Sequence, residues 1–111
     1  MDSCDLLCLD LQVAERLRDT LDPERSAQLA ATLKVFADPT RLLIVQALAR
    51  HELCGCDLGW ITGQSDKVVS HHLSRLRREG LIASRRDAKI VFTSLTETGR
   101  ALIEMIDGIL A

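Results

Sequence analysis

The strongest constraint on the fold is one amphipathic helix followed by two short β-prone stretches. Ser65 is suited to cap the start of this helix, and Gly80 is suited to end it after Glu79. Its inner face carries apolar residues at helical spacing, which are Val69, Leu73 and Leu76. The β-prone stretches are Leu81–Arg85 and Ile90–Leu95, joined across Arg86–Lys89. This order predicts a helix with a hairpin beside it.

A second, shorter helix is expected just before it. Asp57 can cap this helix, which continues through Trp60 and Ile61 and ends at Gly63. The tight Gly63-Gln64 turn then joins the two helices. Two helices joined in this way and followed by a hairpin make a winged helix-turn-helix. The predicted fold class is therefore mainly α with a β-hairpin wing.

The remaining segments are also expected to be helical. A weak helix is predicted over 11–21, and Asp-Pro pairs at 22–23 and 38–39 each signal a new helix start. The second pair begins a helix from Thr40 to about Ala49 that is apolar nearly all round, as a buried central helix would be. We expect one winged-helix and dimerisation domain over 11–111, preceded by a flexible metal-binding arm over 1–10.

The last helix, capped by Thr96, has a wide apolar surface for a chain of 111 residues. Its apolar residues are Leu102, Ile103, Ile106, Ile109 and Leu110. So large a surface on a small body favours an interface with a second copy, so a homodimer is predicted. No apolar run reaches the roughly 18 residues of a membrane span, and the acidic start does not resemble a signal peptide. A cytoplasmic location with reduced thiols is expected.

The formal charge of −2 is unevenly distributed. Residues 66–89 hold seven Lys/Arg against three Asp/Glu, a net charge of +4, whereas the rest of the chain has a net charge of −6. A basic segment on an acidic body favours contact with phosphates, although a solvated charged face is the simpler alternative. Polar and cationic residues lie opposite the apolar stripe of the amphipathic helix and at the hairpin, where they suit operator DNA. The candidate DNA-binding residues are Ser65, Lys67, Ser70, His71, Ser74, Arg75, Arg78, Arg86 and Lys89.

The four cysteines form two close pairs. Cys54 and Cys56 stand on either side of Gly55, and Cys4 and Cys8 lie in the expected arm. In a continuous helix, residues two apart point in directions about 200° apart, so a shared metal at the first pair requires a non-helical junction. Either pair alone would also suit buried small apolar residues. Together they indicate a metal or redox function.

Three motifs in order resemble the ArsR/SmtB metalloregulatory repressors. They are Ala37–Leu42, Glu52–Leu58, and Val69–Leu73 with Glu79-Gly80-Leu81. The resemblance covers about residues 25–100 and implies a winged-helix homodimer that leaves its operator when metal binds. Two positions depart from the family pattern: Ala88 stands where glycine often completes the wing turn, and Thr93 stands where an aromatic residue is common.

The cysteine pattern resembles the cadmium/lead-sensing CadC branch of that family. This resemblance implies that Cys4 and Cys8 of one subunit join Cys54 and Cys56 of the other, although a site within one subunit stays open. Cadmium(II) or lead(II) is the expected inducer, with zinc(II) possible. Gly59 stands where the arsenite-sensing branch usually has a third cysteine.

Other functions remain as alternatives. An arsenite-responsive or thiol-redox-sensing repressor of the same fold is the nearest, and a structural zinc module is another. A thiol oxidoreductase built on Cys54 and Cys56 would need a thioredoxin-like βαβ setting, which this helical pattern lacks. No other catalytic constellation is visible, so the chain is expected not to be an enzyme.

Overall fold

The computed structural model describes residues 10–109, which belong to two compact units, Met1–Ala31 and Thr32–Ala111. The first unit contains α1 (Leu11–Thr20) and most of α2 (Pro23–Val35). Asp10 caps α1 by accepting a hydrogen bond from the Val13 N–H at 3.2 Å. Every described residue of this unit is exposed to solvent. Its helices therefore lack a core of their own within residues 10–31.

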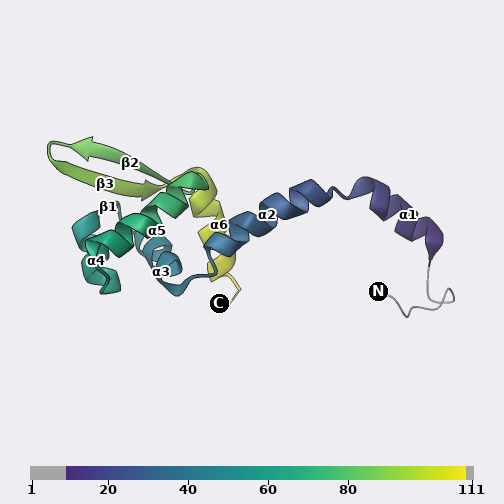
Figure 1. The fold of residues 1–111 in the computed structure, drawn as a ribbon, viewed down its shortest axis with the longest axis horizontal. Coiled ribbons are helices and arrows are strands. Elements are labelled where there is room, and N and C mark those ends of the chain that lie inside the picture. Colours follow the sequence, from purple (N-terminus) through teal and green to yellow (C-terminus); the bar gives the residue numbers. More distant parts are fainter. Residues whose placement is uncertain (1–9, 110–111) are drawn as a thin grey trace. The chain divides into compact units, whose positions relative to one another are not determined.

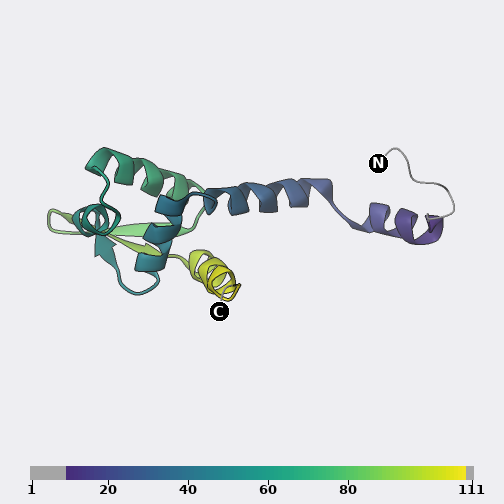
Figure 2. The ribbon, with the colours of Figure 1, turned by 90° about the horizontal axis from the view of Figure 1, so that it is seen from below.

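The second unit contains the other elements, drawn in Figure 1. In chain order they are α3 (Pro39–Leu48), β1 (Leu53–Cys54), α4 (Gly55–Thr62), α5 (Asp66–Arg78), β2 (Ile82–Asp87), β3 (Ile90–Leu95) and α6 (Glu97–Asp107). Figure 2 shows α5 on one side of the sheet and α6 on the other. The expected mainly helical fold with a β-hairpin wing is confirmed.

A small antiparallel sheet has the strand order β1-β3-β2. The β2–β3 hairpin pairs from Ile82 with Leu95 to Asp87 with Ile90, and it extends away from α6 (Figure 1). Strand β1 pairs Cys54 with Phe92 on the other edge of β3. Strand β1 was not predicted from the sequence, because a strand of two residues carries no periodic pattern of its own.

The core of this unit lies where α3, α4, α5 and α6 meet the sheet. Its largest fully buried side chains are Ile44, Leu48, Leu58, Leu76, Leu81 and Ile103. Thr93 is buried among them at 2% exposure, and its hydroxyl lies 3.4 Å from the Ser84 hydroxyl. That partner explains how a polar residue is accommodated at this position in the wing. Gly99 brings α6 close to the chain at Leu81, where a Cβ would overlap the Leu81 carbonyl.

Three of the expected helix starts are confirmed by their capping bonds. Ser65 accepts from the Val68 N–H, Thr96 from the Gly99 N–H, and Asp38 from the Arg41 N–H. The prediction that Asp57 caps the helix before the Gly63 turn is wrong. Helix α4 begins at Gly55, with Cys54 as its N-cap, three residues before the predicted cap. Asp57 stabilises the same end from inside the first turn, where a carboxylate also suits the helix dipole.

The wing turn is shorter than the sequence indicated. Strand β2 continues through Asp87, so only two residues, Ala88 and Lys89, connect it to β3. Ala88 has φ of 56°, and it is the one non-glycine residue in the described chain with positive φ. A positive φ at the first of two turn residues is typical of a type II′ hairpin, which prefers glycine there. None of the helices within residues 10–109 is long and apolar enough to cross a membrane.

Candidate DNA interface and thiol site

A tight turn joins α4 to α5 as expected of a helix-turn-helix. Gly63 ends α4 in the left-handed conformation with φ of 70°, and its N–H donates to the Gly59 carbonyl at 2.9 Å. Glycine adopts this conformation without the steric cost that a side chain would bring. Ser65 then caps the start of α5, so three residues, 63–65, connect the two helices.

Helix α5 presents one apolar face to the core and one polar face to solvent. Val69, His72 and Leu76 are buried, whereas Leu73 is half-buried. Most of the candidate DNA-binding residues on this helix and at its cap are exposed. These are Ser65, Lys67, Ser70, His71, Ser74 and Arg78. Arg75 is half-buried, so its guanidinium lies nearer the protein body than the others. The arrangement offers cations and hydroxyls for phosphates and base edges.

The wing carries two of the candidates, Arg86 on β2 and Lys89 in the turn, both exposed. Arg85 lies beside Arg86 on β2, but its side chain pairs with a carboxylate of the protein. Its guanidinium donates to both carboxylate oxygens of Glu52, with the shortest contact at 2.6 Å, and lies 4.8 Å from the centre of the Phe92 ring. The bonds to Arg85 hold the pKa of Glu52 below its usual value. This pair fastens β2 to the segment before β1.

His72 is buried on the inner side of α5, where its ring is hydrogen-bonded to the protein. Its Nδ1 lies 3.3 Å from the Arg41 Nη1, and the Arg41 Nε donates to the Val35 carbonyl at 2.7 Å. Burial is the main cause that lowers the pKa of His72, so a neutral ring can accept from the guanidinium. These bonds connect α5 to α3 and to the end of α2.

The two described cysteines lie at the junction between the wing sheet and α4. Cys54 is half-buried and Cys56 is exposed, and both are free thiols. The Cys54 Sγ donates to the Asp57 Oδ2 at 3.1 Å, and the Cys54 N–H donates to the same oxygen at 3.2 Å. These two bonds lower the pKa of Asp57. The junction is extended at Cys54 and helical from Gly55, so Cys56 lies in the first turn of α4.

Cys4 and Cys8 lie outside the described residues. Within residues 10–109, no group of three or more His, Cys, Asp or Glu side chains is arranged to hold a metal ion. The donor set at the junction is therefore two sulfur atoms, which suit a soft ion but leave its coordination incomplete. Additional ligands would have to come from beyond this set.

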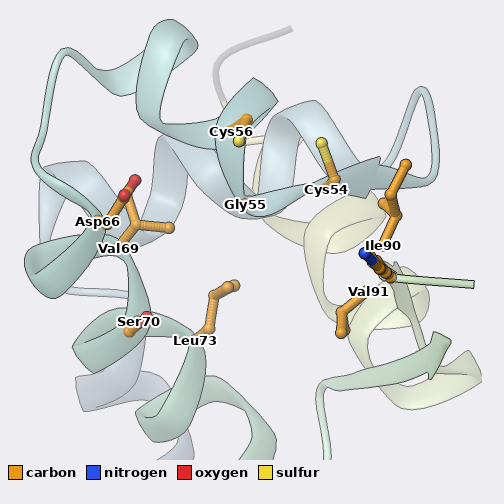
Figure 3. A pocket seen from close by; sticks show the side chains of 10 residues that line it. Cys54, Gly55, Cys56, Asp66, Val69, Ser70, Leu73, Ile90 and Val91 are labelled. Carbon is orange, nitrogen blue, oxygen red and sulfur yellow. The ribbon is translucent and has the colours of Figure 1, made fainter.

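A cavity of about 370 Å³ opens beside the cysteines (Figure 3). Its lining comes from the end of β1 and the start of α4 on one side and from α5 on the other: Cys54, Gly55 and Cys56, and Asp66, Val69, Ser70 and Leu73. Lys89, Ile90 and Val91 close it from the wing. The cavity thus lies where the thiols, the polar helix α5 and the wing come together.

Three features of this region did not follow from the sequence. The β1 pairing and the partner of Arg85 depend on residues about 30 to 40 positions apart, so no local pattern announces them. Trp60 was grouped with the apolar residues of its helix, yet it is 90% exposed. Its spacing from the buried Leu58 was the available signal, because residues two apart on a helix point to nearly opposite sides.

Comparisons with known proteins agree with this geometry. The profile of the arsR family of bacterial regulatory proteins matches residues 38–84. A transcriptional repressor SmtB homolog from Synechocystis is 35% identical over 87% of this chain and 74% of its own length. The cadmium resistance transcriptional regulatory protein CadC from Listeria innocua is 32% identical over 80% of this chain and 76% of its own length.

A similar fold is found among solved structures. Reduced HlyU from Vibrio cholerae superposes with a TM-score of 0.71 at 33% identity. The match covers 78% of this chain and 92% of the HlyU chain. The helix-turn-helix and its wing are thus shared by sequence and by structure with transcription regulators.

Proposed function

Because this chain belongs to the ArsR family of bacterial regulatory proteins, we propose that it is a transcriptional repressor controlled by a soft metal ion. The dimer binds operator DNA, and cadmium(II) or lead(II) on cysteine thiolates releases it, with zinc(II) as a weaker inducer. The observation that carries this proposal is the position of Cys54 and Cys56 at the start of α4, directly before the helix that presents the polar face.

DNA binding is assigned to the exposed face of α5 and to the wing. In a dimer, two such helices would enter successive major grooves about 34 Å apart on an imperfect palindrome. Met105 of α6 and Ile109 just after its end are exposed apolar residues, and they favour a second copy as the partner. The exposed leucines of α1 and α2 favour the same partner, since they have no core of their own.

The DNA assignment is tested by single substitutions. Replacing His71 or Arg75 by Ala should weaken operator binding by roughly 1–3 kcal/mol, whereas Lys89→Ala should mainly reduce its dependence on salt. Arg50→Ala removes an exposed cation that belongs neither to the helix-turn-helix nor to the wing, and it serves as the control. Unchanged operator affinity in all three interface variants would contradict the assignment of this face.

The proposed metal site uses Cys54 and Cys56 with Cys4 and Cys8, and the arm cysteines come from the partner subunit. Two thiols at the junction are too few for a closed site, and the arm supplies two more. Thiolates bind soft ions in preference to zinc, which favours cadmium and lead. When bound, the ion supplies the attraction that draws these thiolates together.

The junction is well placed to affect DNA binding because Cys54 belongs to two elements. Its backbone pairs with Phe92 in the wing sheet, and it is also the N-cap of α4. A displacement of Cys54 therefore acts on the wing and on the helix that precedes α5. A hundredfold loss of operator affinity needs about 2.8 kcal/mol of coupling, which is within the usual range for linked sites.

The decisive experiment mixes two defective subunits. A Cys4→Ser/Cys8→Ser subunit and a Cys54→Ser/Cys56→Ser subunit should each fail to respond to cadmium as homodimers. If the site joins two subunits, their heterodimer regains one complete four-thiolate site, seen as sulfur-to-metal charge-transfer absorption. An intra-subunit site would give no recovery.

Measuring operator binding while an inducer is added distinguishes the proposed function from the arsenite-responsive and redox-sensing alternatives. Under reducing conditions, a redox sensor would keep its DNA when cadmium is added in stoichiometric amounts. An arsenite sensor would release DNA with arsenite at lower concentration than with cadmium. The proposed function predicts release by cadmium and lead with all thiols reduced.

A further inference from the structure

A groove runs along the flank of α5 that faces the wing. The cavity of about 370 Å³ beside the cysteines and a second one of about 260 Å³ are both lined by Gly55, Ser70, Leu73 and Val91. This shared lining joins the two cavities into one groove between α5 and β3. Either volume is enough for a small organic molecule, since an apolar cavity of about 150 Å³ can hold benzene.

The middle of the groove is apolar. In Figure 3, Leu73 on α5 and Val91 on β3 lie on opposite sides of the cavity. Val91 is 41% exposed, so part of its side chain is in contact with water. An apolar ligand between these two residues would remove that surface from water, which favours binding.

One end of the groove carries a positive charge. Among the described residues, Arg77 is the one charged residue that lines the smaller cavity. Its Nη2 donates to the Ser84 hydroxyl at 2.9 Å, which holds the side chain in place. No carboxylate within residues 10–109 forms an ion pair with Arg77. Because a guanidinium has five N–H donors, Arg77 has donors left for an anionic ligand.

The other end of the groove carries charges of both signs. Asp66 and Lys89 line the larger cavity, so the attraction of one for an anion is offset by the repulsion of the other. Asp66 and Arg77 are eleven residues apart on α5, which places their Cα atoms about 16 Å apart along the helix axis. An anionic group is therefore favoured at the Arg77 end, far from the Asp66 carboxylate.

We propose that this groove binds a small organic carboxylate, with the carboxylate on Arg77 and an apolar ring system between Leu73 and Val91. The planar fork of an arginine matches the two oxygens of a carboxylate. Ser70 and Arg77 both line the smaller cavity and lie about 10 Å apart along the helix axis, which suits an acid of one or two rings. No cysteine serves as a ligand, so this inference goes beyond the proposed metal response.

The bound acid is expected to weaken operator binding. Ser70 and Lys89 line the larger cavity, and both are candidate DNA contacts. A carboxylate in the groove adds negative charge beside a surface that is assigned to DNA phosphates. Linkage then requires operator DNA to weaken binding of the acid by the same factor. This effect on DNA rests on the proposed function, whereas binding of the acid does not.

The first test measures binding by isothermal titration calorimetry with the reduced, metal-free, full-length protein and no DNA. The probe is 2-naphthoate. 2-Naphthamide has the same rings without the charge, and acetate has the charge without the rings. 2-Naphthoate should bind at least about tenfold more tightly than either, because it alone uses both Arg77 and the apolar middle.

The same titrations define the results that would overturn the proposal. Equal affinities for 2-naphthoate and 2-naphthamide would show that no cation binds the carboxylate. Equal affinities for 2-naphthoate and acetate would show that the apolar middle of the groove is not used. No measurable binding of 2-naphthoate would also overturn the proposal.

Two matched pairs of variants locate the site, again without DNA. Arg77→Gln should weaken 2-naphthoate binding about tenfold, whereas Arg78→Gln changes the next exposed arginine, which lines neither cavity, and should leave this binding unaltered. Ser70→Leu should block the groove, whereas Ser74→Leu makes the same change one turn later on α5, outside both cavities. Equal effects of the two members of either pair would refute the location of the site.

The second test measures operator affinity by fluorescence anisotropy. Saturating 2-naphthoate should weaken operator binding of the wild-type protein about fivefold or more, which is within the usual range for linked sites, and it should not affect that of Arg77→Gln. Unchanged operator affinity of the wild type would overturn the predicted effect on DNA. Cadmium added alone tests the proposed function separately. A protein that ignores cadmium but binds 2-naphthoate would contradict the proposed function and support the present inference.

Discussion

Replacing Ala88 by glycine should stabilise the protein, because Ala88 holds a backbone conformation that suits glycine better. Its φ is 56° in a two-residue turn between Asp87 and Ile90. For an L-residue, the left-handed region costs about 1–2 kcal/mol relative to the right-handed one. Glycine removes this cost but gains freedom in the unfolded chain, which offsets about 0.4–1 kcal/mol. The net expected gain is about 0.5–1 kcal/mol.

The assay is thermal unfolding at one fixed protomer concentration, because the apparent stability of a dimer depends on concentration. A gain of this size should raise Tm by about 3 °C for a domain of this length. Ala83→Gly is the matched control: Ala83 is exposed on the adjoining strand β2, pairs with Ser94, and has no positive φ. There glycine should cost about 0.5–1 kcal/mol. If Ala88→Gly lowers Tm as Ala83→Gly does, the positive φ at the turn is refuted.

Three further outcomes are expected. Gly99→Ala should lower the free energy of unfolding in urea by about 1–3 kcal/mol, because the new methyl group would overlap the Leu81 carbonyl; unchanged stability would show that α6 does not approach so closely. Glu52→Gln and Arg85→Gln should each lower the free energy of unfolding, and their effects should not add in the double variant. This non-additivity should shrink in high salt. Strict additivity would mean that the pair does not interact. Burial lowers the pKa of His72 in the folded state, so the unfolded chain binds the proton first and the free energy of unfolding falls as pH drops below about 6.5. His72→Gln should weaken this fall. A pH profile of stability between 7 and 5.5 that the substitution leaves unchanged would contradict the burial of a neutral ring.

The helix ends that depend on local bonds could be predicted from the sequence. Ser65, Thr96 and Asp38 each accept from a backbone N–H three residues ahead, and that preference is visible in a short window. The same rule was wrong for Asp57, because it stabilises its helix from the third helical position and not from the N-cap. Both arrangements place a carboxylate near the same free N–H groups, so residue type alone does not choose between them.

The polar face of α5 could also be predicted from the helical spacing of its apolar residues, because one buried stripe determines which residues point outward. Whether each wing cation has a carboxylate partner could not be predicted in this way. Arg85 and Arg86 are neighbours of the same type, yet only Arg85 meets the Glu52 carboxylate, which is 33 residues away. The cavity beside Cys54 likewise depends on how α4, α5 and β3 pack, and no spacing in the chain encodes its volume.

On the proposed DNA interface, the Glu52–Arg85 pair changes how many ions the wing would displace from the duplex. When a cation on the protein neutralises a phosphate, condensed counterions leave the duplex, and the number released sets the slope of log affinity against log salt. Arg85 already has a carboxylate partner on the Nε–Nη2 edge of its guanidinium, so Arg86 and Lys89 are the wing cations left to displace counterions. Counting the Arg and Lys side chains in the sequence would assign three counterion-displacing cations to each wing, whereas the structure supports two.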